Sequence, residues 1–469
     1  MRLTGARLLS ILGSIYGLFV SLIYTLVVTR HLSTSELATL VVFNAGNGIA
    51  LGILGYVTTW YPRVLAKQPE RYAELAGAGI VASFIAWCSL VVYMALYGRL
   101  DVIILSLGFI IITLYSWPAT AYLSIYEQRT LSILVNISQT IKLAGAFVVR
   151  HNPSASAVLL VNIAMTLPTT IAKLVKPKIF GSISLLRELL RGAPYQTLVL
   201  SFPLVGAITT YALYLAGGDL LLSYNYILFQ IYKSVYPALA IVPLMYSSLL
   251  TENNKLQRAL LDGAVLLYLY LVAAAVMSKS PEWYIAVLRP SELGNAQLVE
   301  AVWLNGVALL ISGIWFHVDT TLRGVEEKVI FMLKDRPAKA LMFDVAMAPA
   351  TIALTYLLAK SYGAPGMVIA ITIAGILMVA YRLKLLGRDY LPLLTRLHLP
   401  ALLTLIILYI LPIPLLPYVK GSVVETVATY IPNAVILATV TLVLFAALSP
   451  PAREALSILL KRLRTAPRS

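Results

Sequence analysis

Apolar runs long enough to cross a bilayer recur along the whole chain. The hydrocarbon core of a membrane is about 30 Å thick and needs about 20 apolar residues per helix. About fourteen runs meet this requirement, at 8–29, 37–62, 75–98, 102–126, 130–149, 154–176, 194–217, 221–250, 258–278, 300–322, 338–359, 363–382, 399–419 and 426–448. Charged residues make up only 12% of the chain, about half of their share in soluble domains. The sequence therefore predicts an all-α polytopic membrane protein with about fourteen transmembrane helices.

Basic residues are distributed unevenly among the loops that join these runs. With the N-terminus in the cytoplasm, the cytoplasmic segments hold 27 of the 36 Lys and Arg residues, against 11 of the 20 acidic residues. That count includes Arg382, which we assign to the loop after the twelfth run. The net charge of +16 therefore lies on one face, as the positive-inside rule requires. We expect a multi-pass protein of the cell membrane with both termini in the cytoplasm and no nucleic-acid partner.

Residue types that several kinds of chemistry require are missing or scattered. The single cysteine, Cys88, excludes a disulfide framework and a multi-cysteine metal site. The sequence has no Gly-rich phosphate loop, the four histidines are dispersed, and the outer loops carry only isolated carboxylates such as Asp101 and Asp219. We therefore expect a protein that is not an enzyme and that holds no cofactor or metal.

Two cytoplasmic segments have the composition of helices that lie on a membrane surface. Residues 450–469 form a basic tail with an apolar helical face, and 184–191 (SLLRELLR) has the same character. Such helices suit contact with anionic lipids; a solvated connector is the alternative. The second segment lies in a linker, 177–193, that separates six runs from six. This division predicts an N-lobe (1–176), a C-lobe (194–386) and two further spans (387–449) before the tail.

Two lysines stand near the middle of apolar runs. Lys142 and Lys233 each lie about 18 Å from a membrane surface at 1.5 Å per residue, one in each predicted lobe. Neither has an acidic residue three or four positions away. Because charges inside lipid are unfavourable, both are candidates for binding an anionic substrate; alternatively, either is neutral or is neutralised by an aspartate of another helix. Each lysine continues a stripe of polar residues at helical spacing. Asn136 and Gln139 precede Lys142 in the fifth run, and Tyr226 and Gln230 precede Lys233 in the eighth.

Two aspartates within apolar runs are candidates for a coupling-ion site. Asp319 precedes Arg323 by four residues, so that a structural ion pair is preferred to a proton relay. His317, beside it, belongs to the residue type that titrates near neutral pH, although an interfacial polar anchor is its simpler interpretation.

Asp344 begins a further polar stripe that continues to Thr351 and Thr355. This stripe can line a cleft or bind a coupling cation, but Asp344 also lies shallow enough to pair with the basic loop around Lys339.

The second run carries two central asparagines, Asn44 and Asn47, and two glycines four residues apart, Gly48 and Gly52. Small residues at this spacing allow helices in lipid to pack closely. The asparagines either form hydrogen bonds between helices or contact sugar in a cleft.

A short motif occurs at equivalent places in the two predicted lobes. The loop after the fourth run reads LSIYEQR (123–129) and the loop after the tenth reads LRGVEEK (322–328), so both follow L-x-x-x-E-x-[R/K]. Each loop joins the fourth span of its lobe to the fifth. This placement favours two six-span repeats, as in many transporters.

The same regions carry a resemblance to a known family. The chain resembles the multidrug/oligosaccharidyl-lipid/polysaccharide flippase superfamily over nearly its whole length, in particular the polysaccharide and O-antigen flippase branch. The elements concerned are TRHLSTSE (29–36), LRELLRGAP (186–194), DLLL (219–222), LRGVEEK (322–328) and YGAPG (362–366). The chain departs from the family pattern in having no Gly after Glu36 and in having Pro365, Gly366 and Met367 in place of small residues, which leaves the substrate subgroup open.

The resemblance implies a fold and a function. The fold has two six-helix lobes around a central cleft, as in MATE transporters, with two C-terminal helices outside it and alternating access by rocking of the lobes. The function is a flippase that moves a lipid-linked saccharide with a diphosphate headgroup, held by Lys142 and Lys233, for cell-surface glycan synthesis. Glycosyltransferases or a polymerase of the same pathway are the partners it implies. The alternatives are a cation-coupled drug or metabolite exporter that uses Asp344 and Asp319, and a non-transporting scaffold of a glycan-assembly complex.

Overall fold

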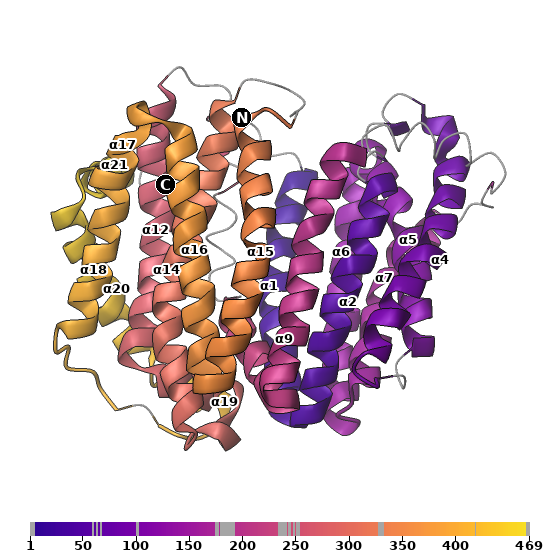
Figure 1. The fold of residues 1–469 in the computed structure, drawn as a ribbon, viewed down its shortest axis with the longest axis horizontal. Helices are drawn as coiled ribbons and strands as arrows, with labels where there is room; N and C mark the ends of the chain where they lie inside the picture. The colour runs from indigo at the N-terminus through magenta and orange to yellow at the C-terminus, as the bar shows by residue number, and fades with distance from the viewer. Residues whose placement is uncertain are drawn as a thin grey trace. The chain divides into compact units, whose positions relative to one another are not determined.

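Helices form all the regular secondary structure of the described residues (Figure 1). The computed structural model describes residues 5–58, 61, 64–65, 68–99, 103–173, 178, 193–232, 242, 245–246, 249, 254–326, 333–417 and 419–465. The helices before the middle of the chain are α1 (Gly5–His31), α2 (Thr34–Thr58), η1 (Pro69–Arg71), α4 (Tyr72–Ala95), α5 (Ile103–Tyr126), α6 (Gln128–His151), α7 (Ala155–Ala172) and α9 (Ala193–Tyr232). Those that follow are α12 (Lys255–Lys279), α13 (Pro281–Leu288), η4 (Pro290–Glu292), α14 (Ala296–Val325), α15 (Arg336–Tyr362), α16 (Ala364–Leu386), η5 (Arg388–Tyr390), α17 (Leu391–Leu393), η6 (Leu394–His398), α18 (Leu399–Ile410), α19 (Val423–Ala428), α20 (Ile431–Leu448) and α21 (Pro450–Thr465).

The spanning helices agree with the predicted apolar runs. Among the described residues, 11 helices are long and apolar enough to cross a membrane. α1, with 27 residues, and α5, with 24, also have the length of a span. α9 has 40 residues and covers the seventh predicted run and the start of the eighth, with a break at Gly217 and Gly218, where φ is −158° and +60°. Helices thus occur at all the predicted runs, the eighth as far as Tyr232 and the thirteenth as far as Ile410, and the all-α multi-pass prediction is confirmed.

The chain forms two units, Met1–Tyr211 and Ala212–Ser469. Within the first unit, α1 packs on α6, α2 on α4, α4 on α5, and α7 on both α5 and α6. Gly48 and Gly52 of α2 face the part of α9 that belongs to this unit: a Cβ atom on Gly52 would lie 2.5 Å from Leu200 Cδ1 and 3.0 Å from Pro203 Cγ. The two glycines thus leave room for the Leu200 and Pro203 side chains. The lobe boundaries inferred from span counting stay a prediction.

Within the second unit, α14 packs between α12 and α16, and α15 packs on α16. α18, α20 and α21 pack against α12. The basic tail forms α21, in which Ala452 is buried, Ala455 and Leu456 are half-buried, and Arg453 and Lys461 are exposed. Part of the apolar face that the sequence assigns to lipid therefore packs on α12, α20 and η6. The other predicted interfacial segment, 184–191, lies outside the described residues.

The motif shared by the two halves places its leucine and its first glutamate at similar positions in each. Leu123 and Leu322 are both fully buried, in the last turns of α5 and α14. Glu127 and Glu326 each follow the helix directly. In the first unit, Glu127 Oε1 lies 2.7 Å from Lys173 Nζ. The motif thus consists of a buried leucine in the last turn of a helix and a glutamate directly after that helix.

The YGAPG segment forms the tight turn between α15 and α16. Gly363 adopts a φ of +64°, in the left-handed region that favours glycine. Gly366 lies directly on the α15 backbone, where a Cβ atom would overlap the Leu358 carbonyl oxygen. The two glycines of this element are therefore required by backbone geometry and close helix approach.

Replacing Gly366 with Ala should lower the free energy of unfolding by about 1–3 kcal/mol, because a helix backbone cannot yield to the added methyl group. Thermal unfolding of the detergent-solubilised protein measures this loss. Gly294→Ala is the matched control, since no atom lies within 4 Å of its Cβ position. Equal melting temperatures for the two variants would contradict the backbone contact.

Candidate functional site

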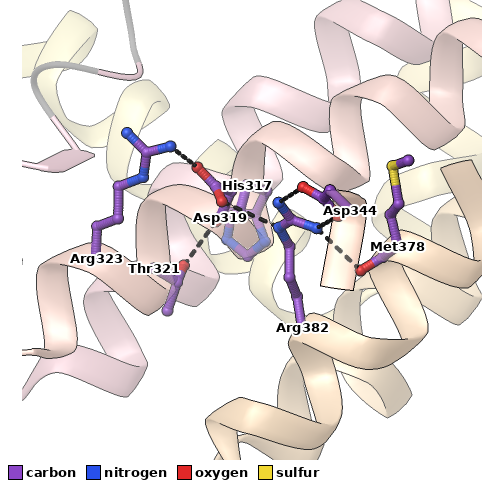
Figure 2. Close-up of polar contacts among 7 residues, drawn as sticks. All are labelled: His317, Asp319, Thr321, Arg323, Asp344, Met378 and Arg382. Carbon is purple, nitrogen blue, oxygen red and sulfur yellow. Dashed lines mark hydrogen bonds and ion pairs between the residues drawn. The ribbon is translucent and has the colours of Figure 1, made fainter. Parts of the chain in front are cut away.

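A buried arginine joins three helices of the second unit (Figure 2). Arg382 on α16 has no exposed surface. Its Nε donates a hydrogen bond to Asp319 Oδ1 on α14 at 3.0 Å. Its Nη1 and Nη2 donate to the two carboxylate oxygens of Asp344 on α15, at 2.8 and 2.5 Å. This paired arrangement uses the planar fork of the guanidinium, which a lysine cannot reproduce.

The charges of this network cancel one another. Asp319 Oδ2 lies 2.8 Å from Arg323 Nη2, one turn along α14, so all four carboxylate oxygens of the two aspartates have a guanidinium partner. Arg382 also donates to the Met378 carbonyl oxygen at 3.3 Å and lies 4.9 Å from the centre of the Trp315 ring. Two negative and two positive charges therefore balance within one cluster, which is the arrangement that low-dielectric surroundings demand.

These positions both confirm and correct the sequence analysis. The Asp319–Arg323 ion pair expected from the four-residue spacing is present. The assignment of Arg382 to a cytoplasmic loop was wrong, because the residue lies inside the helix bundle of the second unit. Asp344 pairs with this arginine. Thr351 and Thr355, which continue the stripe, each donate to a carbonyl oxygen one turn earlier in α15.

Two histidines form a second buried polar pair beside this network. His317 Nε2 lies 2.9 Å from the Ala259 carbonyl oxygen on α12, and His317 Nδ1 lies 2.9 Å from His398 Nε2. A carbonyl oxygen only accepts, so His317 carries a proton on Nε2, and in a neutral His317 the Nδ1 then accepts from His398 Nε2. His398 Nδ1 is then a bare acceptor, buried and without a hydrogen-bond partner in the described part of the chain. Both imidazoles are neutral in this arrangement.

Local backbone features bring the histidines together. His398 ends the π-helical turn η6, an irregularity that reorients side chains within a helix. Gly263 on α12 leaves room for the imidazole, since a Cβ atom there would overlap His317 Nε2. The pair thus connects α12, α14 and the helical segment that begins α18. His398 was not among the site residues predicted from the sequence.

In the first unit, Lys142 lies near the middle of α6 against α1. Its Nζ is 2.9 Å from Ser21 Oγ and 5.4 Å from the centre of the Tyr24 ring. Within the residues that the structure describes, no carboxylate forms an ion pair with Lys142, which agrees with the absence of an acidic neighbour in the sequence. The Asn136 Oδ1 and Gln139 Oε1 atoms of the same stripe are buried and have no described hydrogen-bond partner.

The remaining predicted site residues have varied surroundings. Asn44 is exposed, whereas Asn47 Oδ1 is buried and has no described hydrogen-bond partner. In the second unit, Gln230 is buried with its Oε1 unpaired among the described residues, and Tyr226 is half-buried one turn earlier in α9. Lys233 lies outside the described residues. No group of three or more His, Cys, Asp or Glu side chains suited to a metal ion occurs in the part of the chain described.

Comparison with known proteins identifies the fold. No family model matches the chain, and no curated protein matches it in sequence. A solved structure described as the lipid II flippase MurJ, in an inward closed conformation, is similar with a TM-score of 0.67 and 13% identity, over 92% of this chain and 98% of that one. This chain shares that fold. An inward-facing multidrug resistance MATE family transporter of the MOP superfamily is similar with a TM-score of 0.58 and 14% identity, over 79% of this chain and 95% of that one.

Replacing His398 with Leu should lower the free energy of unfolding by about 1–3 kcal/mol, because His317 Nδ1 loses its donor in a buried environment. Thermal unfolding in detergent measures the effect. His151→Leu is the control, because His151 is an exposed histidine at the end of α6. If both variants melt at the temperature of the unchanged protein, the buried pair contributes nothing to stability.

Proposed function

We propose that this protein is a flippase that carries a lipid-linked saccharide with a phosphate or diphosphate headgroup across the cell membrane by alternating access. The observation that carries the proposal is that Lys142 has no carboxylate partner among the described residues. A lysine near the middle of a membrane helix is unfavourable unless it is paired or functional, and the only described polar partner of Lys142 is the hydroxyl of Ser21.

The surroundings of Lys142 suit an anionic group. An ammonium group has three N–H donors, of which the Ser21 contact uses one. A phosphate or diphosphate supplies several acceptors, and a lysine binds such a group as a compact point charge. The amide oxygens of Asn136 and Gln139, which have no described hydrogen-bond partner, lie on the same stripe and can accept hydrogen bonds from hydroxyl groups of the first sugar. Lys233, Gln230 and Tyr226 form the corresponding stripe of the eighth run, and we propose the same role for them.

The fold of this chain occurs both in a lipid II flippase and in a multidrug transporter, so the choice between a lipid-linked substrate and a drug rests on the residues of this chain. A cation-coupled exporter, the second candidate, would use Asp344 and Asp319. The carboxylate oxygens of both residues are engaged by Arg382 and Arg323, which favours the flippase. Anionic lipid, bound by the basic cytoplasmic tail, and enzymes of the same glycan pathway are the partners that we propose.

Lys142→Ala should lower the initial rate of lipid-linked saccharide translocation at least about tenfold, the factor that corresponds to losing one charge-assisted contact. The assay uses proteoliposomes with a fluorescent lipid-diphosphate saccharide on one leaflet. Lys142→Arg should retain part of the rate because the charge is kept. Lys360→Ala, which changes an exposed lysine at the end of α15, is the matched control. An unchanged rate in Lys142→Ala would remove the headgroup role of this residue.

Lys233→Ala tests the second stripe in the same vesicles, with protein insertion checked by the folded fraction in detergent. We expect translocation to be lost, because one cationic contact to the headgroup is removed. Unchanged rates would confine the anion-binding role to the first unit.

The exporter is tested with the unchanged protein. Proteoliposomes loaded with a cationic dye, under a sodium or proton gradient, should show no gradient-driven flux if the protein is a flippase. Dye flux that disappears in Asp344→Asn would instead support the exporter.

A further inference from the structure

We infer that Arg382 is the resident cation of the Asp319–Asp344 pair, so that no inorganic cation binds these carboxylates while the arginine is in place. The inference deepens the proposed function and, for transport, rests on it. It concerns how translocation is driven. The sequence suggests Asp319 and Asp344 as a coupling-ion site, but a side chain of the protein permanently occupies the position between them.

The geometry leaves no carboxylate oxygen of the two aspartates without a cationic partner. A hard monovalent or divalent cation in this cluster would take carboxylate oxygens as its ligands. Both oxygens of Asp344 and one of Asp319 accept hydrogen bonds from Arg382 at 3.0 Å or less. The remaining oxygen of Asp319 lies 2.8 Å from Arg323. The two guanidinium groups already neutralise both carboxylates, so an inorganic cation that approached these oxygens would be repelled unless it displaced a guanidinium group.

Displacement of the arginine is unfavourable for two reasons. Arg382 is fully buried, and it would leave two carboxylates behind in surroundings of low dielectric constant. A guanidinium also stays protonated at any physiological pH, so pH changes do not vacate the position. Arg323 cannot take over, because its side chain is 40% exposed and contacts only one of the two aspartates.

Removal of the arginine should therefore create an ion-binding site. Two carboxylates held on α14 and α15 would keep a net negative charge and an emptied volume between them. A sodium ion is a small cation that such a pair of carboxylates attracts. The variant should depend on sodium for stability, whereas the unchanged protein should not.

The test compares Arg382→Met, which keeps the length of the apolar stem without the charge, with the unchanged protein. Thermal unfolding is measured in detergent while choline chloride is replaced by sodium chloride at constant ionic strength. In choline, Arg382→Met should melt about 5–10 °C below the unchanged protein. Sodium should raise its melting temperature by about 3 °C or more in a saturable manner, and should leave the unchanged protein unaffected.

The matched control combines Arg382→Met with Asp319→Asn and Asp344→Asn, which removes the carboxylates along with the arginine. This triple variant should show no sodium response. Arg382→Lys, a second variant, keeps one charge that cannot reach both carboxylates in the manner of the fork, and should show a smaller sodium response than Arg382→Met.

Three results would overturn the inference. One is a saturable sodium response of the unchanged protein that is lost in Asp344→Asn. Another is an Arg382→Met protein that folds but is indifferent to sodium. The third is failure of both Arg382→Met and Arg382→Lys to fold in sodium as well as in choline, since an inorganic ion would then not replace the arginine.

A transport measurement separates this inference from the proposed function. Saccharide translocation by the unchanged protein should proceed at the same rate with sodium or choline in the vesicles. Absence of any translocation would contradict the proposed function while leaving the unfolding results valid. Translocation that requires sodium, together with a sodium response of the Asp319–Asp344 pair, would contradict the inference alone.

Discussion

The absence of water from the bilayer core constrains every part of this chain. A backbone N–H or C=O group in lipid has to find its partner within the protein, and a helix satisfies both groups within one segment. This is why composition alone predicts the fold class. The same constraint applies to charged side chains, which persist in the membrane only when they are paired or when a ligand pairs them. Each membrane charge in the described residues is therefore informative about function.

The two units meet this constraint differently. In the second unit, Asp319, Asp344, Arg323 and Arg382 form a neutral cluster in which every carboxylate oxygen has a partner. In the first unit, Lys142 has a hydroxyl partner and an aromatic ring, but no described counter-ion. A closed cluster stabilises a helix arrangement, and removal of one member destabilises it strongly. A cation without a counter-ion attracts an anion from outside the protein. This difference between the paired charges of the second unit and Lys142 is the basis for placing ligand binding at Lys142.

The sequence predicted the helices well and the ion pairs poorly, for a physical reason. Spans depend on the local sum of apolar residues, and the Asp319–Arg323 contact depends on a fixed helical spacing, so both can be derived from neighbouring residues. The partners of Arg382 lie 63 and 38 residues away, and no local rule connects them. One signal was present: two aspartates inside apolar runs require a cation, and Arg382 is the last residue of the twelfth run. Counting it with the loop concealed that match. His398 was missed similarly, since its position just before the thirteenth run does not indicate the π-helical turn that directs it towards His317.

α14 connects the two buried clusters of the second unit. His317 joins it to α12 and to the start of α18, and Asp319, two residues later, joins it to α16. Separation of these helices is unfavourable, because each hydrogen-bonding group and each charge would then be buried without a partner. α12, α14, α15, α16 and the start of α18 are therefore held together by contacts that no ligand needs to complete. The stripe of Lys142, Asn136 and Gln139 has the opposite property: its donors and acceptors are incompletely used in the absence of a ligand. Binding of an anionic, sugar-bearing headgroup would satisfy them, and for this reason we place substrate recognition on this stripe, with the stripe of Tyr226 and Gln230 as its proposed counterpart, rather than on the paired aspartates and arginines of the second unit.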